Sequence, residues 1–174
     1  MPGRYLITGV AGSGKSTLEK LFRQDGYVTI DIDDGFTEWR HAETDEVLPY
    51  TPDEEGWHEV AEWVVKTDKL QVFFDEHPTD DVFVFGSFAR LTAVVGMFTK
   101  IILLEYPSET TVRQRIANRD GGYGKHTHEL TRILSYVQPY QDKMKAAGAL
   151  AIDCTLPIDE VTQWIKRQLC YNTD

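Results

Sequence analysis

Short apolar runs alternate with helix-type patterns along most of the chain. The runs are rich in Ile, Val, Leu and Phe, and Gly, Pro or Asp bounds most of them. Such runs are typical of strands that are buried in a parallel sheet. We therefore predict five strands, at residues 5–8, 27–32, 82–85, 101–105 and 150–153. Their alternation with helices predicts a three-layer α/β/α fold with one parallel sheet at its centre.

Apolar residues spaced three and four positions apart predict the helices. Residues 16–22 form one amphipathic pattern, and the stretch LQVFFDEH reads as the end of another helix. Two later stripes predict long helices, one that begins near residue 127 and ends at Gly148, and one that begins near Ile158.

A further helix is predicted to begin at Thr51, a capping residue that is followed by a first-turn proline. The apolar stripe behind it consists of Trp57, Val60, Ala61 and Val64. On this reading Trp57 and Trp63 pack in or near the core and do not stack on a ligand.

Two segments fit no regular pattern. Residues 33–50 combine acidic, other polar and aromatic side chains, and residues 119–127 contain three glycines within four positions. Irregular segments of this size in a compact domain are commonly functional. We expect an acceptor-side insertion at 33–52 and a short lid at 119–127.

Composition and charge limit the classes of partner. The 174 residues suit a single domain, 1–174, and 18 Lys and Arg against 28 Asp and Glu give a net charge of −10. A nucleic-acid partner is not expected, because nucleic-acid binders usually carry a basic excess. No apolar stretch is long enough to span a membrane, and the two cysteines show no CxxC spacing. We expect a cytoplasmic protein with reduced thiols. The sequence does not determine the oligomeric state, and we favour a monomer.

One motif carries specific chemistry. Residues 9–16, GVAGSGKS, match the Walker A pattern G-x-x-x-x-G-K-[ST] without a mismatch. Its backbone N–H groups and the following helix N-terminus favour phosphate, its lysine reaches the terminal phosphates, and the Ser16 hydroxyl is a ligand for Mg²⁺. The sequence therefore predicts ATP and Mg²⁺ as cofactors. The residues expected to contact ATP here are Gly9, Ala11, Gly12, Ser13, Gly14, Lys15, Ser16 and Thr17.

From this motif onward the chain resembles the P-loop small-molecule kinases of the adenylate, shikimate and gluconate kinase group. Asp31 and Asp33 lie at the C-terminal end of the second strand and resemble the Asp-x-Asp of shikimate and gluconate kinases. The resemblance implies that Asp31 holds the metal through water and that Asp33 acts on the acceptor hydroxyl, either as a base or by orienting it. Gly86 stands after the third strand, where adenylate kinases carry an acid that organises the metal. Because this acid is absent here, Asp31 becomes the more important candidate for the metal site.

The resemblance extends to the segments expected to enclose the substrates. Arg115 and Arg119, four residues apart, resemble the Arg-x-x-x-Arg that precedes the lid of adenylate kinases, which implies catalytic and ATP-binding roles. Thr155 and Pro157 are expected to contact the adenine. The acceptor pocket is expected to include Asp33, Trp39, Arg40 and Arg90.

The sequence as a whole predicts a kinase of small polar metabolites, with phosphate transfer to a hydroxyl. For the five strands the resemblance implies the order 2-3-1-4-5. Three alternatives stay open: hydrolysis of ATP without an acceptor, action on a nucleoside or nucleotide, and a nucleotide-dependent switch. The acceptor itself is not identified by any residue pattern.

Overall fold

The computed structural model describes residues 2–51, 56–118 and 126–170. Its centre is a parallel sheet of five strands in the order β2-β5-β1-β6-β7. These are β1 (Arg4–Thr8), β2 (Val28–Asp31), β5 (Val82–Phe85), β6 (Lys100–Glu105) and β7 (Leu150–Asp153). Counted among themselves, the five strands follow the order 2-3-1-4-5. The labels differ from the expected numbers because two further strands, β3 and β4, intervene in the chain.

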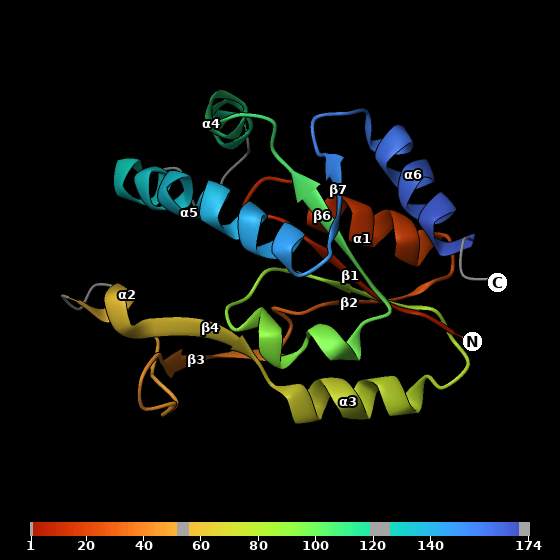
Figure 1. Cartoon of the computed structure of the whole chain (residues 1–174), viewed down its shortest axis with the longest axis horizontal. Coiled ribbons are helices and arrows are strands. Elements are labelled where there is room, and N and C mark those ends of the chain that lie inside the picture. Colours follow the sequence, from red (N-terminus) through yellow and green to blue (C-terminus); the bar gives the residue numbers. More distant parts are fainter. Residues whose placement is uncertain (1, 52–55, 119–125, 171–174) are drawn as a thin grey trace.

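Helices cover both faces of this sheet, as the layers in Figure 1 show. The helices are α1 (Lys15–Gln24), α2 (Trp57–Val60), α3 (Thr67–Glu76), α4 (Glu109–Ala117), α5 (Thr127–Ala146) and α6 (Ile158–Cys170), with 3-10 turns η1 (Leu91–Ala93) and η2 (Val95–Met97). Successive strand residues alternate between two apolar cores, since Ile7 belongs to one core and Leu6 to the other. The first core includes residues of α1, α4, α5 and α6, and the second includes residues of α3, η1 and the end of α5.

The segment between β2 and β5 differs from its prediction. The helix expected from Thr51 is wrong: α2 is a single turn at Trp57–Val60, and the chain continues as strand β4 (Ala61–Val65). Strand β3 (Thr37–His41) lies within the stretch expected to be irregular, and it pairs antiparallel with β4. Together they form a two-stranded hairpin, separate from the main sheet, which projects beside α3 in Figure 1.

The other helix predictions agree with the structure. LQVFFDEH lies mostly in α3, and α5 and α6 match the two late stripes. Helix α5 contains Pro139 and is followed by Gly148, whose φ of 86° is the left-handed conformation that ends many helices. Within the described residues, no helix combines the length and the apolar character that membrane crossing requires.

Candidate active site

The Walker A residues form a tight loop between β1 and α1. Gly9, Gly12 and Gly14 all have positive φ, at 157°, 80° and 98°. At Gly9 a side chain is also excluded by space, because an added Cβ would lie 2.7 Å from Ser13 Oγ and 2.8 Å from the Leu104 carbonyl oxygen. The glycines thus let the backbone curl around the start of α1.

Several groups of this loop are left for a ligand. Among the described residues, the backbone N–H groups of Gly12, Gly14 and Ser16 donate no hydrogen bond to the protein. Ser13 is 3% exposed, and its Oγ is the buried side-chain polar atom of the described chain that lacks a partner. Inward-facing amides at a helix N-terminus suit phosphate oxygens. The loop therefore fits the phosphates of a nucleotide.

Lys15 lies within the same loop. Its Nζ donates hydrogen bonds to the carbonyl oxygens of Gly9 and Val10, the second at 3.1 Å. These carbonyls hold the ammonium group over the curled backbone. Lys15 is also close enough to Asp31 to oppose the rise in the pKa of that carboxyl. The structure thus places the P-loop lysine near Asp31, at the end of β2.

Asp31 is the last residue of β2, and Asp33 lies in the turn that follows. Asp31 Oδ1 accepts a hydrogen bond of 3.1 Å from the Asp33 backbone N–H. Burial raises the pKa of Asp31, and the charges of Asp33 and Asp34 raise it further. A partly buried carboxylate whose charge is disfavoured suits a site that receives a cation.

Mg²⁺ can be tested against these groups. Within the described part of the chain, no group of three or more His, Cys, Asp and Glu is arranged to hold a metal ion. Mg²⁺ in phosphate sites takes only one or two protein ligands and completes its shell with phosphate oxygens and water. Ser16, in the first turn of α1, and Asp31 supply that kind of donor set, so the residues fit the ion.

Asp33 has a partner that the sequence did not reveal. Trp63 of β4 donates a hydrogen bond of 2.8 Å from Nε1 to Asp33 Oδ1. On the same side of the hairpin, the ring of Trp39 lies 4.9 Å from that of Trp63. Trp63 was expected to pack in the core, and its only sequence signal is the aromatic and β-branched run of residues 60–65, which favours a strand.

Gly86, at the position where adenylate kinases carry an acid, is required by packing. Its φ is 154°, and an added Cβ would overlap Cγ2 of Ile32. Ile32 is fully buried, and its backbone N–H donates to the Phe85 carbonyl oxygen at 2.8 Å. A side chain at this position is thus excluded by the turn that carries Asp31 and Asp33.

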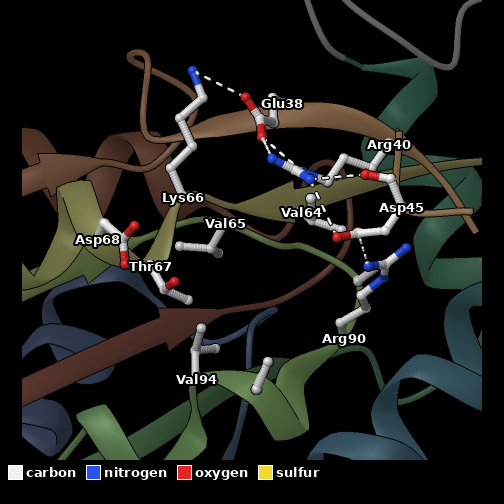
Figure 2. Close-up of a pocket in the computed structure, with 12 residues that line it drawn as sticks. Glu38, Arg40, Asp45, Val64, Val65, Lys66, Thr67, Asp68, Arg90 and Val94 are labelled. Carbon is white, nitrogen blue, oxygen red and sulfur yellow. Dashed lines mark hydrogen bonds and ion pairs between the residues drawn. The ribbon is translucent and has the colours of Figure 1, made fainter. Parts of the chain in front are cut away.

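Arg40 and Arg90 lie together, but on the other face of the hairpin from Trp39. Residues alternate between the faces of a strand, so Glu38 and Arg40 face away from Trp39. They line a cavity of about 500 Å³, together with Arg90 and the N-terminal end of α3 (Figure 2). No residue of the Walker A loop, and neither Asp31 nor Asp33, lines this cavity.

Apart from Asp68, the charged side chains that line this cavity form a continuous chain of ion pairs (Figure 2). Arg40 pairs with Glu38 and with Asp45, at 3.2 Å for the second pair. Arg90 pairs with Asp45 and donates to Glu62 at 2.6 Å and to the His41 carbonyl oxygen at 3.1 Å. Arg90 also has a left-handed backbone, with φ of 54°. We call this ion-pair chain Lys66–Glu38–Arg40–Asp45–Arg90–Glu62.

A second cavity of about 150 Å³ opens beside the Walker A loop. Ser13, Gly14 and Thr17 line it together with Arg115, whose Nη2 donates to the Cys154 carbonyl oxygen at 2.6 Å. Leu156 belongs to the lining, but Thr155 and Pro157 do not. Thr155 instead donates to Asp153 Oδ1 from its N–H and its hydroxyl, at 2.7 and 2.6 Å.

Two remaining expectations concern a thiol and the lid. Cys154 is a free, buried thiol, and burial raises its pKa to about 11, which keeps it protonated at neutral pH. Arg119 and the three glycines of the expected lid lie outside the described residues. His126, in the described part of that segment, directly precedes α5.

Comparison with known proteins gives matches at the level of structure only. No protein-family model matches the chain, and no curated protein matches it. A gluconokinase from Sinorhizobium meliloti 1021 aligns over 99% of this chain and 98% of its own, with 16% identity and a TM-score of 0.56. A shikimate kinase from Acinetobacter baumannii, in complex with shikimate, aligns over 99% and 96%, with 14% identity and a TM-score of 0.63.

A deoxyadenosine kinase from M. mycoides with bound dATP aligns over 96% of this chain and 98% of its own, with 13% identity and a TM-score of 0.53. These neighbours are P-loop kinases of small molecules. The fold of this chain is the fold that they share. At such low identity the likeness concerns the fold, and the residues of the site carry the argument about chemistry.

Proposed function

We propose that this protein transfers the γ-phosphate of ATP to a hydroxyl group of a small acceptor. The observation that carries the proposal is the placement of Asp31 near Lys15, with Asp33 bonded to Asp31 through its N–H, beside a loop whose amides are available for phosphate. A phosphate cradle alone suits any nucleotide-binding protein. A carboxylate near its lysine, with a second carboxylate two residues further on, adds what an acceptor alcohol requires.

Each residue then has a distinct role. The phosphates are surrounded by the residues of the loop, which are Gly9, Ala11, Gly12, Ser13, Gly14 and Thr17. Lys15 neutralises the charge on the transferring group. Mg²⁺ would be held by Ser16 directly and by Asp31 through water. Mg²⁺ supplies charge stabilisation to the phosphate oxygens when it is bound. Arg115, at the second cavity, lies beside the nucleotide. Arg119, Thr155 and Pro157 stay predicted contacts of ATP.

Asp33 orients the acceptor. Trp63 occupies Oδ1 of this carboxylate, and no described residue bonds to Oδ2, which is left for the acceptor hydroxyl. In the transfer, the hydroxyl oxygen forms a bond to the γ-phosphorus, the bond from that phosphorus to ADP breaks, and the hydroxyl proton is released to solvent. Trp39 lies on the acceptor side, whereas the ion pairs of Arg40 and Arg90 favour a structural role for both in the hairpin.

The test is to incubate the protein with ATP labelled at the γ-phosphate and with a panel of metabolite alcohols that includes nucleosides. Label that moves to an acceptor supports the proposal, and nucleosides as the sole acceptors would make the protein a nucleoside kinase. Release of free phosphate alone, or intact ATP, would contradict the proposal. Lys15→Ala is the control for the cradle, with Lys20→Ala, an exposed residue of the same helix, as its matched variant.

A further inference from the structure

An aromatic surface lies directly beside Asp33. It consists of Trp39, Tyr50, Trp57 and Trp63, and we call it the aromatic face. The ring of Trp39 is its centre, 4.8 Å from Trp57, 4.9 Å from Trp63 and 6.1 Å from Tyr50. Trp39 and Trp63 are half-buried and Tyr50 is 66% exposed, so ring surface is accessible to a ligand there. An acceptor held at Asp33 would lie against these rings.

The basic side chains of the same region already have partners. Arg40, Lys66 and Arg90 belong to the ion-pair chain, and Lys69 donates to the Gly35 carbonyl oxygen at 3.0 Å with its Nζ over the ring of Phe36. These are all the Lys and Arg of residues 33–69, together with Arg90. To bind any of these four side chains, a carboxylate or phosphate group on the acceptor would have to displace it from its partner.

The charge of the acceptor-side segment, residues 33–69, also disfavours an anionic acceptor. Residues 33–69 contain 12 Asp and Glu but 3 Lys and Arg, so their net charge is 3 − 12 = −9, against −10 for the whole chain. An excess of one sign of charge in the acceptor-side segment attracts ligands of the opposite sign and repels ligands of the same sign. Ring faces attract cations as well, through the negative potential above the aromatic carbons.

We infer, on the basis of the proposed function, that the acceptor is an alcohol that carries an ammonium group. Its cationic end packs against the aromatic face, and its hydroxyl reaches the free oxygen of Asp33. Aromatic rings and excess negative charge both favour such a ligand. An anionic acceptor is disfavoured by the segment charge, and Arg40 and Arg90 are held in ion pairs on the other face of the hairpin.

Tryptophan fluorescence can test this directly, because three of the four tryptophans of the chain belong to the aromatic face and the fourth is Trp164 in α6. The probes are choline, its uncharged isostere 3,3-dimethylbutan-1-ol, and the anion 3-hydroxypropanoate. The first two share shape and hydroxyl and differ in charge. We expect choline to bind about 2- to 30-fold more tightly than the isostere, which is the range of a cation–π contribution.

Substitutions identify the surface. In Trp39→Leu the preference for choline over the isostere should fall to near unity, whereas Trp39→Tyr, which retains a ring face, and Trp164→Phe should keep it. Equal binding of choline and its isostere by the unsubstituted protein would overturn the inference, as would tighter binding of 3-hydroxypropanoate. The comparison in the unsubstituted protein decides the matter even if a variant fails to fold.

A transfer assay separates this inference from the proposed function. ATP labelled at the γ-phosphate is offered with amino alcohols and amino sugars, with the matching neutral alcohols, and with the matching hydroxy acids. Highest kcat/KM with the ammonium-bearing set supports both conclusions. Transfer mainly to hydroxy acids would overturn the inference and support the proposed function. Preferential choline binding without transfer to any alcohol would contradict the proposed function alone.

Discussion

The indole N–H of Trp63 donates to the carboxylate of Asp33 across 30 positions of sequence, at 2.8 Å. The bond ties the hairpin strand β4 to the turn after β2. The carbonyl of Trp63 also accepts a hydrogen bond of 2.7 Å from the Ala89 N–H, so that β4 is attached to the loop after β5 as well. Trp63 therefore joins the hairpin to the ends of two core strands and fixes the orientation of the carboxylate that we propose faces the acceptor.

This bond predicts the effect of Trp63→Phe, which keeps an aromatic ring but removes the N–H donor. Hydrogen bonds to charged groups contribute about 1.5–3 kcal/mol, so the loss of orientation should lower kcat by about tenfold or more. The KM for ATP should stay unchanged, because the hydrogen bonds of Trp63 in the described structure go to Asp33 and Ala89 and not to the Walker A loop. Steady-state kinetics of the variant measure both.

Trp57→Phe is the matched control for that experiment. Trp57 belongs to the same aromatic face, but its Nε1 donates to the Pro49 carbonyl oxygen at 3.1 Å and not to Asp33. Trp57→Phe keeps a ring on the aromatic face and leaves the bond to Asp33 intact, so its kcat should fall much less than that of Trp63→Phe. Equal loss of kcat in the two variants would show that Trp63 acts through general packing of the hairpin.

Asp31 gives a second prediction, in which stability and function change in opposite directions. Burial raises the pKa of Asp31 above its ordinary 3.8, so the folded state holds its proton more tightly than the unfolded state. As pH rises from about 3.8 through the raised pKa, this group lowers the stability of the fold, and the penalty then stays at neutral pH. Asp31→Asn should therefore raise the melting temperature of the ligand-free protein at neutral pH.

The gain should disappear in acid, where Asp31 is protonated and resembles Asn. The same variant should bind ATP with a weaker dependence on Mg²⁺, because a water-bridging carboxylate has been lost. Thermal denaturation across the pH range and ATP titrations with and without Mg²⁺ check the two effects. A lower melting temperature at neutral pH would mean that the Asp31 carboxylate stabilises the turn after β2.

The core strands and the phosphate loop were predictable from the sequence because their signals are local. A buried parallel strand is apolar on both faces, and a Walker A loop is one contiguous motif, so neither depends on a distant partner. The strand predictions for residues 82–85 and 150–153 agree with β5 and β7 to the residue.

The hairpin was missed because its pairing is not local. Trp57, Val60, Ala61 and Val64 fit a helical stripe, and only the partner strand, which pairs Trp39 with Trp63, makes the strand conformation the better one. The same pairing brings Trp63 to Asp33. For Arg90, the sequence indicated a charge near the acceptor but not Asp45 and Glu62, the acids that pair with it.

Gly86 predicts a stability effect with a defined rescue. Gly86→Ala combines strain at a φ of 154° with overlap between the new Cβ and Cγ2 of Ile32. It should lower the free energy of unfolding by about 2–4 kcal/mol, measured by chemical denaturation. The double variant with Ile32→Ala removes the overlap but not the backbone strain. It should therefore be more stable than the sum of the two single effects predicts, and strict additivity would contradict the steric account.

Asp45 offers a test of the ion-pair chain through pH. Hydrogen bonding to Arg90 lowers the pKa of Asp45 below its ordinary 3.8, so its contribution to stability is complete above about pH 4 and is lost as pH falls through the lowered pKa. Asn is suited to the replacement, because it tolerates the left-handed backbone that Asp45 adopts at φ of 62°. Asp45→Asn should lower the melting temperature near neutral pH, and the difference from the unsubstituted protein should shrink toward zero as the solution is acidified below about pH 4.

Glu43→Gln, in the same loop and without a side-chain ion pair in the described structure, should leave the melting temperature nearly unchanged at either pH. A loss in Asp45→Asn that is independent of pH would show that Asp45 stabilises the loop through its backbone conformation and not through its pairs with Arg40 and Arg90.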